Sequence, residues 1–400
     1  MKSKLPLEGI VAIDFSTLIA APIVGTIMAD FGAEVIKVEL PKIGDPQRGI
    51  RALGGKGRSH NWLVGGRNKK AITLDLHSKK GQELARKLCE KADVALFNFR
   101  PGVLDKWNLG PDILHQINPN LIICLVSGYG QTGPYKHKGG FDRTISAFAG
   151  LTYTSGYAEH PPVRSGHPLV DYLTAYLGAF AVMMALYNRD VNQNGGEVID
   201  LSLAEAAFKA TGGSLTTYSL TGSIYERCGN RIRFFVPAEN FETSNGEFIA
   251  INAGTEKLWK QLVRAMNRED LLTSKKYGKY MARFQNQDEL YKLIGEWVKS
   301  KTTQEVMHIL EREGVPCDKV NNIADLATDP HMLERDAILL LNDDDYGDLL
   351  IPGIVPKLKN FPGKVKFLGV GLGEYNQEIF EHFLGLTPEE IKDLVEKGII

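Results

Sequence analysis

Short apolar runs alternate with helical segments through the first third of the chain. Residues 10–15 form an apolar run, residues 21–31 are helical in composition and close at Gly32, and residues 34–38 form a second strand-like run. The alternation continues with strands over 71–76, 94–98 and 121–127, a helix from a Ser78 cap to about Lys91, and helical spacing over 104–117 broken at Gly110-Pro111. Buried strands separated by helices predict an α/β fold with a parallel, doubly wound sheet. Such sheets bind ligands at the carboxyl ends of their strands.

The pattern changes after the last of these strands. Residues 128–166 are rich in Gly, Ser, Thr and Pro, which predicts a long functional connection without a regular element. An apolar helix begins near Asp171, and a strand over 197–201 and a helix through Lys209 follow. The chain then becomes more charged, with a strand pair turned at Asn245-Gly246 and several amphipathic helices. We therefore predict three segments: a large domain over 1–222, a small domain over 223–325, and a stretch over 326–400 that returns to the large domain.

Composition narrows the classes of partner. The 400 residues carry 47 Lys and Arg against 48 Asp and Glu, a net charge of −1, and 43% of them are hydrophobic. A nearly neutral chain has no global field that attracts nucleic acid or an anionic membrane, so an anion site must be local. The four cysteines are far apart in sequence, which predicts free thiols in a reducing compartment.

Two apolar stretches raise the question of a membrane or of export. The uncharged stretch over 172–188 is 17 residues long, shorter than the roughly 20 residues that a spanning helix needs, and predicts a core helix. The stretch over 18–29 follows Glu8 and Asp14, and an acidic leader argues against a signal peptide. We therefore expect a cytoplasmic protein that binds neither a membrane nor nucleic acid.

Three groups of residues are candidates for chemistry with an anion. Glycines with Lys and Arg over 54–58 and 65–70 resemble a phosphate cradle, although the spacing alone favours a solvated basic loop. Arg100-Pro101-Gly102 is a stronger candidate, because it directly follows the strand over 94–98. Asp171 opens the apolar helix, so the pattern favours an N-cap over a nucleophile, yet a partly desolvated carboxylate beside a Gly-rich loop suits both roles.

Histidines and cysteines give little support to other chemistries. His60, His137, His160 and His167 lie in loops, but the chain has no H-E-x-x-H or G-x-S-x-G motif and no metal-ligand spacing, so we expect no metal. Cys124 lies in an apolar strand and is expected to be inert. The acidic run over 343–345 indicates a solvated turn.

Taken together in their order along the chain, several motifs resemble the family III CoA-transferases, which include formyl-CoA and carnitinyl-CoA transferases, and more distantly the α-methylacyl-CoA racemases. The resemblance covers nearly the whole chain, and its shared order is what makes it specific. The matching segments are Leu7-Glu8-Gly9-Ile10, Gly32 to Glu39, Gly44-Asp45-Pro46, Asn68 to Leu76, Asn98 to Gly102, Ser127 to Gly130, Gln131 to Pro134, Gly314-Val315-Pro316, Asp329-Pro330 and Leu372 to Asn376.

The resemblance implies a fold, substrates and a site. The fold would be a Rossmann-like large domain with a smaller second domain, in two chains interlocked as a homodimer. The substrates would be coenzyme A, as an acyl-CoA, and a carboxylic acid. The family's nucleophilic aspartate falls on Asp171, which reverses the preference for an N-cap. The positions implied to contact CoA are Ala20, Leu74, Asp75, Leu76, His77, Asn98, Phe99, Arg100 and Lys106.

Departures from the family bear on the reaction. The histidine of the racemases is replaced in the step Gly140-Phe141-Asp142, so one proton-transfer group is missing. Ile19 replaces a glutamine of formyl-CoA transferase, and no run of glycines follows Phe241; Leu40 replaces a common arginine. We expect a CoA-transferase that works through an aspartyl-CoA thioester. An acyl-CoA racemase or epimerase and a noncatalytic CoA-binding module are the alternatives.

Overall fold

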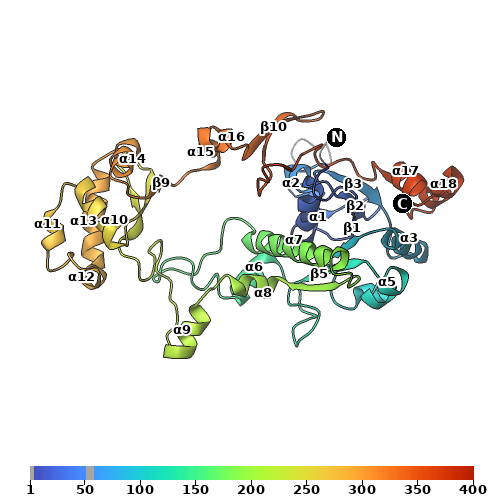
Figure 1. Ribbon diagram of the computed structural model, residues 1–400, viewed down its shortest axis with the longest axis horizontal. Helices are drawn as coiled ribbons and strands as arrows, with labels where there is room; N and C mark the ends of the chain where they lie inside the picture. Colours follow the sequence, from blue (N-terminus) through green and yellow to red (C-terminus); the bar gives the residue numbers. More distant parts are fainter. Residues whose placement is uncertain (1–3, 51–57) are drawn as a thin grey trace. The chain divides into compact units, whose positions relative to one another are not determined.

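The computed structural model describes residues 4–50 and 58–400. Its centre is a six-stranded sheet in the order β3-β2-β1-β4-β5-β6, and every neighbouring pair is parallel (Figure 1). The strands are β1 (Val11–Asp14), β2 (Glu34–Glu39), β3 (Lys69–Thr73), β4 (Val94–Phe97), β5 (Ile122–Ser127) and β6 (Val198–Ser202). The predicted α/β fold with a doubly wound parallel sheet is confirmed.

Alternate residues of the strands face two separate hydrophobic clusters. Ala12 and Val35 pack with α1 (Ala20–Asp30) and α7 (Leu169–Asp190) on one face of the sheet. Ile13 and Ile36 pack with helices on the other face. Successive side chains of a strand point to opposite faces, and both faces are covered, so the strands read as continuous apolar runs. The helices of the second face are α3 (Lys79–Glu90), α5 (Pro111–Ile117) and α18 (Pro388–Glu396).

Helices α1 and α7 lie side by side over the first face (Figure 1). Their close approach depends on Gly178, where an added Cβ would stand 2.8 Å from Val24 Cγ2 and 3.1 Å from Leu201 Cδ2. By length and composition α7 is apolar enough to cross a membrane, but one of its sides is buried in this core. The expectation that the chain is not a membrane protein stays a prediction.

The remaining elements of the first unit are short. They are η1 (Pro46–Arg48), α2 (His60–Gly65), α4 (Val103–Lys106), α6 (Asp142–Phe148), α8 (Leu203–Lys209), α9 (Ser214–Thr221), α16 (Pro330–Glu334), α17 (Asn376–Glu378), the π-helix η2 (Ile379–Phe383) and the hairpin β10 (Ile338–Asp343) with β11 (Gly347–Pro352). Contacts between residues assign to this unit the residues up to 151, 164–220 and 331–400. Helix α9 therefore ends at the border of the unit, and α16 begins at it.

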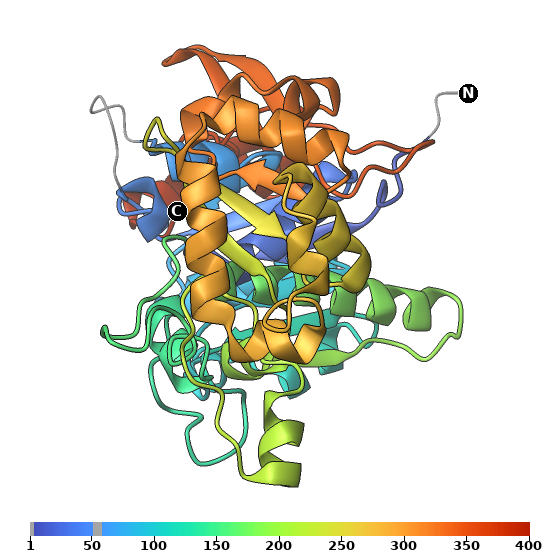
Figure 2. The same ribbon diagram turned by 90° about the vertical axis from the view of Figure 1, so that its left-hand side faces the viewer.

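The second unit comprises residues 152–163 and 221–330. Its three-stranded antiparallel sheet consists of β7 (Ala238–Glu242), β8 (Phe248–Asn252) and β9 (Cys317–Lys319), and the predicted turn at Asn245-Gly246 joins the first two strands. Helices α10 to α14 gather around this sheet (Figure 2). The helices of this unit are α10 (Glu256–Ala265), α11 (Asp270–Thr273), α12 (Tyr280–Gln285), α13 (Gln287–Lys299), α14 (Thr303–Arg312) and, after β9, α15 (Ile323–Ala327).

Two details differ from the expectations. The connection over 128–166 contains α6, whose single buried residue, Ile145, leaves no helical periodicity to detect. Residues 152–163 group with the second unit, where Tyr153 Oη donates to Glu226 and Gly229 N donates to Gly156 O at 2.8 Å. Long-range bonds of this kind have no signature in the local sequence.

Candidate active site

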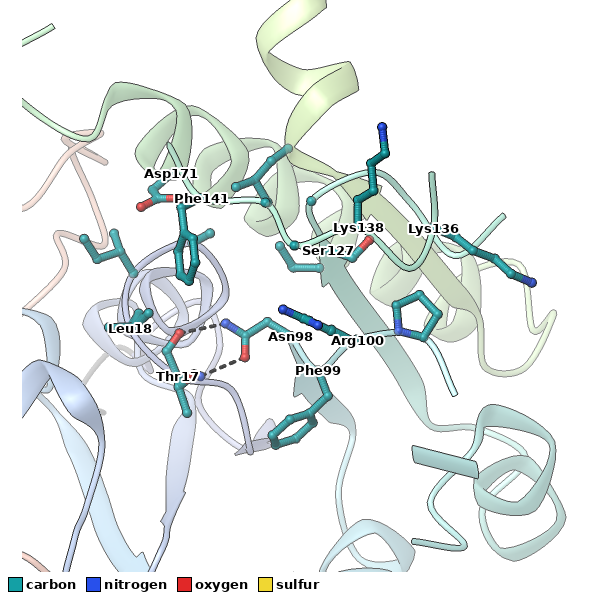
Figure 3. A pocket seen from close by; sticks show the side chains of 18 residues that line it. Thr17, Leu18, Asn98, Phe99, Arg100, Ser127, Lys136, Lys138, Phe141 and Asp171 are labelled. Atoms are coloured by element: carbon teal, nitrogen blue, oxygen red, sulfur yellow. Dashed lines mark hydrogen bonds between the residues drawn. The ribbon is translucent and has the colours of Figure 1, made fainter. Parts of the chain in front are cut away.

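The site lies where the order of the strands reverses. Strand β1 lies between β2 and β4, so the connections that leave β1 and β4 run in opposite directions and open a crevice at their carboxyl ends. A cavity of about 270 Å³ occupies this place (Figure 3). Its walls come from the loop after β1, the start of α1, the loop after β4, the start of the connection after β5, and the first turn of α7.

Asn98 joins the two loops across the crevice. Its Oδ1 accepts a hydrogen bond from Thr17 N at 2.9 Å, and its Nδ2 donates to Thr17 O at 2.7 Å (Figure 3). Both polar atoms of the amide are thus engaged by the backbone of a single residue. This pairing fixes the loop after β1 relative to the end of β4.

The turn after β1 is held in an unusual conformation. Leu18 has a φ of 68°, a left-handed value that is costly for a residue with a Cβ atom. Its N–H donates to Asp45 Oδ1 at 3.1 Å, and Asp45 in turn pairs with the buried Lys37 at 3.2 Å. The Lys37 ammonium also donates to Ser16 O, which precedes the turn by two residues. Buried charges therefore hold the turn that lines the cavity.

A second buried ion pair lies beneath the same turn. Lys69 Nζ lies 2.9 Å from Asp14 Oδ2, and both side chains are almost fully buried. Burial alone would raise the pKa of Asp14, but Lys37 and Lys69 overcome this effect, and the pKa is lowered. Asp14 is thus held ionised at the end of β1.

Three cations border the cavity. Arg100, Lys136 and Lys138 line it, and none of them has a carboxylate partner in the described part of the chain. Arg100 runs close to Gly139, where an added Cβ would stand 3.0 Å from its Nη2. Lys138 lies over the ring of Tyr135, 3.7 Å from its centre. Cations without an internal carboxylate partner are free to bind phosphate or carboxylate groups of a ligand.

Two glycine loops pass back to back at the cavity wall. A Cβ on Gly128 would stand 2.8 Å from Gly140 Cα, and a Cβ on Gly140 would stand 2.7 Å from Gly128 Cα. No side chain fits at either position. The glycines of this connection are therefore required by the close approach of its two ends.

Asp171 lies in the first turn of α7 and lines the cavity beside Phe141 (Figure 3). The preference for an N-cap role, which the sequence pattern gave, is wrong. The N-cap is Pro168, and Asp142 on α6 takes the capping position through space: its Oδ2 accepts from Val170 N at 2.8 Å and from Asp171 N at 3.3 Å. A local sequence pattern cannot show a cap that lies 28 residues away.

The carboxyl group of Asp171 is electrostatically unlike that of Asp14. Its side chain accepts no hydrogen bond from any residue in the described ranges 4–50 and 58–400. Burial, and then the neighbouring charge of Asp142, raise the pKa of Asp171 to about 7. A half-buried carboxyl group with a raised pKa in a cavity is typical of a functional site.

The positions implied by the resemblance divide into two sets. Asp171, Ala20, Asn98, Phe99 and Arg100 all line the same cavity. Among the other lining residues, Phe141 was noted only because it replaces the histidine of the racemases. Leu18, Lys136 and Lys138 had no signal in the sequence, because no motif falls on them.

The other implied positions lie away from this cavity. Leu74 and Leu76 are buried in the core, and Asp75 and His77 form a turn in which His77 N donates to Asp75 Oδ1 at 2.9 Å. They follow β3, two strands away from β1. Lys106 ends α4 and is exposed.

A row of aromatic rings connects the two sets. Phe99 contacts Trp107 edge to face at 4.9 Å between ring centres, and Trp107 contacts His77 in the same way at 5.4 Å. The row therefore leads from the cavity to the loop after β3. Trp107 had no signal in the sequence.

The proposed phosphate cradle does not form over 65–70. Arg67 pairs with Asp30 at 2.6 Å, Lys69 pairs with Asp14, and Lys70 pairs with Glu34 at 2.7 Å. Neither the cradle nor the solvated loop is correct, because these cations neutralise internal carboxylates. The first half of that motif, over 54–57, lies outside the described residues.

Other candidate chemistries receive no support from the described part of the chain. No group of three or more His, Cys, Asp and Glu side chains there is arranged to hold a metal ion. Burial raises the pKa of the Cys89 and Cys124 thiols to about 12, which makes them unreactive. The acidic run over 343–345 is no free turn, since Asp343 and Asp345 both bind Arg58.

The sheet is of the Rossmann type, and at its switch point lies a cavity with a border of cations and a carboxyl group of raised pKa. This combination is typical of α/β enzymes that bind anionic, nucleotide-type ligands. Comparison with known proteins identifies the kind of enzyme. A sequence profile described as CoA-transferase family III matches residues 7–374. The chain belongs to this family, and it is a CoA-transferase that uses CoA thioesters as substrates.

Curated relatives and solved structures agree with this assignment. The chain is 38% identical over 400 residues to the succinyl-CoA–L-malate CoA-transferase beta subunit of Chloroflexus aurantiacus, covering 99% of this chain and 98% of the relative. It is 36% identical over 395 residues to the succinyl-CoA–D-citramalate CoA-transferase of the same organism, with the same coverage. A crystal structure of a CAIB/BAIF family protein from Brucella suis superimposes with a TM-score of 0.83 at 27% identity, over 94% of this chain and 99% of the other. The predicted family and activity are confirmed.

Proposed function

We propose that the enzyme transfers CoA from an acyl-CoA to a carboxylic acid through a thioester formed on Asp171. The observation that carries this proposal is the state of that carboxyl group. It lines the cavity, it has no internal hydrogen-bond donor in the described ranges, and its pKa is raised to about 7. A carboxylate of higher basicity is a stronger nucleophile, and near neutral pH a large share of it is ionised.

The reaction consists of four exchanges between oxygen and sulfur. An Asp171 oxygen attacks the thioester carbonyl carbon, the C–S bond breaks, and a mixed anhydride and CoA thiolate form. The thiolate then attacks the Asp171 carbonyl carbon, releasing the donor acid and leaving the aspartyl-CoA thioester. The acceptor carboxylate attacks this thioester, the C–S bond breaks, and a second anhydride and CoA thiolate form. The thiolate then attacks the acceptor's carbonyl carbon, which gives the new acyl-CoA and releases the Asp171 carboxylate. One thioester replaces another, so the net change in free energy is small.

The cavity and its surroundings suit CoA. Arg100 and the two lysines would neutralise phosphate charge, and Asn98 would hold the crevice open at the switch point. The row of rings from Phe99 to His77 would give the adenine an apolar edge, with Lys106 beyond it. Leu74 and Leu76 would contact the cofactor only through backbone atoms, because their side chains are buried.

The acids are proposed from the names of the relatives. Both Chloroflexus aurantiacus relatives are named for succinyl-CoA with a hydroxy-dicarboxylic acid, malate or citramalate. We therefore propose succinyl-CoA as the donor and a short dicarboxylic acid as the acceptor. A second carboxylate on each acid fits a cavity whose bordering charges are positive.

The apolar side of α7 that faces away from the core supports a homodimer. Its exposed residues recur every three or four positions, and Phe180 and Tyr187 are more than 60% exposed. The stripe consists of Leu169, Tyr172, Tyr176, Phe180, Met184 and Tyr187. We propose a cytoplasmic homodimer, and the four free cysteines suit that compartment. Light scattering should give twice the mass of one chain, and a monomeric mass would contradict the dimer.

The proposed nucleophile is tested by Asp171→Ala. Because this variant cannot form an acyl bond, transfer from succinyl-CoA to a panel of dicarboxylic acids should fall by at least about 10³-fold. CoA binding, measured by calorimetry, should remain within about threefold of the wild type, since the substitution leaves the cation border intact. Undiminished transfer by this variant would refute the role of Asp171.

A further inference from the structure

Helix α7 begins with a cap supplied by another helix. Its N-cap residue, Pro168, has no side-chain acceptor, and the amides of the second and third helical residues, Val170 and Asp171, point to Asp142. These two amides are the ones that an N-cap side chain normally binds. Asp142 is the first residue of α6, which packs against α7.

This arrangement decides what Asp171 itself can do. An aspartate in the first turn of a helix usually turns its carboxylate back to the free amides of that turn. Here Asp142 already occupies two of those amides, so the Asp171 carboxylate is left without a donor and lines the cavity. The external cap thus keeps the nucleophile free.

Asp142 affects Asp171 through its charge as well as through the cap. Both side chains lie at one helix end, and Asp142 has no cationic partner within 4–50 and 58–400. Arg100, Lys136 and Lys138 line the same cavity, but burial and Asp142 are the causes of the raised pKa of Asp171, and Tyr172 is its ionisable neighbour on α7. Two adjacent carboxylates repel each other, and acylation of Asp171 removes one of the two charges. The repulsion therefore favours the covalent adduct over the free carboxylate.

We propose that Asp142 is the positioning residue of this enzyme: it caps α7 in place of Asp171 and, by its charge, favours formation of the acyl and CoA adducts on Asp171. The inference rests on the proposed function of Asp171. It assigns to Asp142 two separable contributions, an acceptor oxygen for the amides and a negative charge.

Two substitutions separate these contributions. Asp142→Asn keeps an acceptor oxygen and removes the charge, and Asp142→Ser offers a smaller uncharged acceptor if the amide variant folds poorly. In both we expect the midpoint of the acidic limb of the kcat/KM profile to move by about one pH unit toward lower pH. The fraction of enzyme trapped as aspartyl-CoA thioester at equilibrium should fall about tenfold. Asp142→Ala, which removes the acceptor too, should lose a further factor of about ten in kcat.

The matched control is Asp112→Asn. Asp112 is also an acid in the first turn of a helix, α5, but it is exposed and is not among the residues that line the cavity of Asp171. Its profile and its adduct fraction should match the wild type.

The readouts distinguish a failure of this inference from a failure of the proposed function. If the wild type yields no thioester on Asp171, the proposed function fails. If the wild type forms the thioester and both uncharged variants keep its pH midpoint and adduct fraction, Asp142 is merely structural and the inference is overturned. A loss of stability in these variants without a shifted midpoint would overturn it equally.

Discussion

Two aspartates near the switch point show how differently one side chain behaves in two surroundings. Asp14 ends β1 and is fully buried, yet its pKa is lowered, because Lys37 and Lys69 outweigh the effect of burial. Asp171 begins α7 and is only half-buried, yet burial and Asp142 raise its pKa to about 7. Burial alone therefore does not determine the charge of a carboxyl group; the sign of its neighbours does.

The difference separates structural from chemical roles. Asp14 and its lysines hold the turn at Leu18, and every charge there is compensated. Asp171 has no such compensation, which costs stability and supplies reactivity. If this account is right, the same change from Asp to Asn should have opposite effects on stability at the two positions.

Asp14→Asn should give the larger effect. It leaves Lys69 buried without its partner, and breaking a buried pair costs about 3 to 5 kcal/mol. Because the pKa of Asp14 is lowered by folding, its contribution is present above pH 3.8 and is lost as the pH falls below that value. Urea unfolding of the wild type and the variant measures the loss of stability at pH 7 and its disappearance in acid. An exposed pair gives the control: Lys80→Ala, opposite Glu83, should change stability by less than about 0.5 kcal/mol.

Asp171→Asn should instead stabilise the fold above pH 7. A pKa raised from 3.8 to about 7 sets an upper limit of ~4 kcal/mol, and partial contact with solvent lowers the expected gain to ~2 kcal/mol. Since folding raises this pKa, the carboxyl group is neutral in both states below about pH 4, and there the variant and the wild type should be equally stable. Unfolding curves at pH 4 and 8 test the sign of the change in the free energy of unfolding. A variant less stable than the wild type at pH 8 would contradict the predicted contrast with Asp14→Asn.

The pH dependence of catalysis sharpens the same contrast. Only ionised Asp171 attacks a thioester, so kcat/KM of the wild type should fall about tenfold per pH unit below a midpoint near 7. Initial rates from pH 5 to 9 with a saturating acceptor measure this. A kcat/KM that stays constant from pH 7 down to pH 5 would show that the pKa of Asp171 is that of an ordinary carboxyl group.

The smallest effect on catalysis is expected at the turn itself. Asp45→Ala removes the acceptor for Leu18 N and the partner of Lys37, so the left-handed turn at the cavity should relax. We expect KM for succinyl-CoA to rise about tenfold with little change in kcat, because the turn positions ligand rather than reacting atoms. An unchanged KM would show that the turn is held without Asp45.

Periodicity predicted the sheet but not the charges within it. The strands around Ile13, Ile36 and Ile123 are continuous apolar runs, and the Ser78 cap accepts from Gly81 N as expected. Lys37 and Lys69 lie in such strands as well, and no local pattern shows that Lys37 meets Asp45 in the turn after β2, or that Lys69 on β3 meets Asp14 on β1. The pair of Lys69 and Asp14 depends on the topology of the sheet, which a local pattern does not contain.

Only part of the site was predictable, because some of its contacts also come from segments that are distant in the sequence. The strand-end rule pointed to Arg100, and the family resemblance pointed to Asn98 and Asp171, all of which line the cavity. The capping pattern misled, because the cap of α7 comes from Asp142 on α6. A short helix with one buried residue carries no periodicity, so its contribution is visible only in three dimensions.

The most direct test is to trap the intermediate. Wild-type enzyme incubated with succinyl-CoA and quenched with hydroxylamine should carry the hydroxamate on one peptide, and tandem mass spectrometry should map it to Asp171 and to no residue in Asp171→Ala. A hydroxamate on another side chain, or none at all while transfer proceeds, would contradict the account.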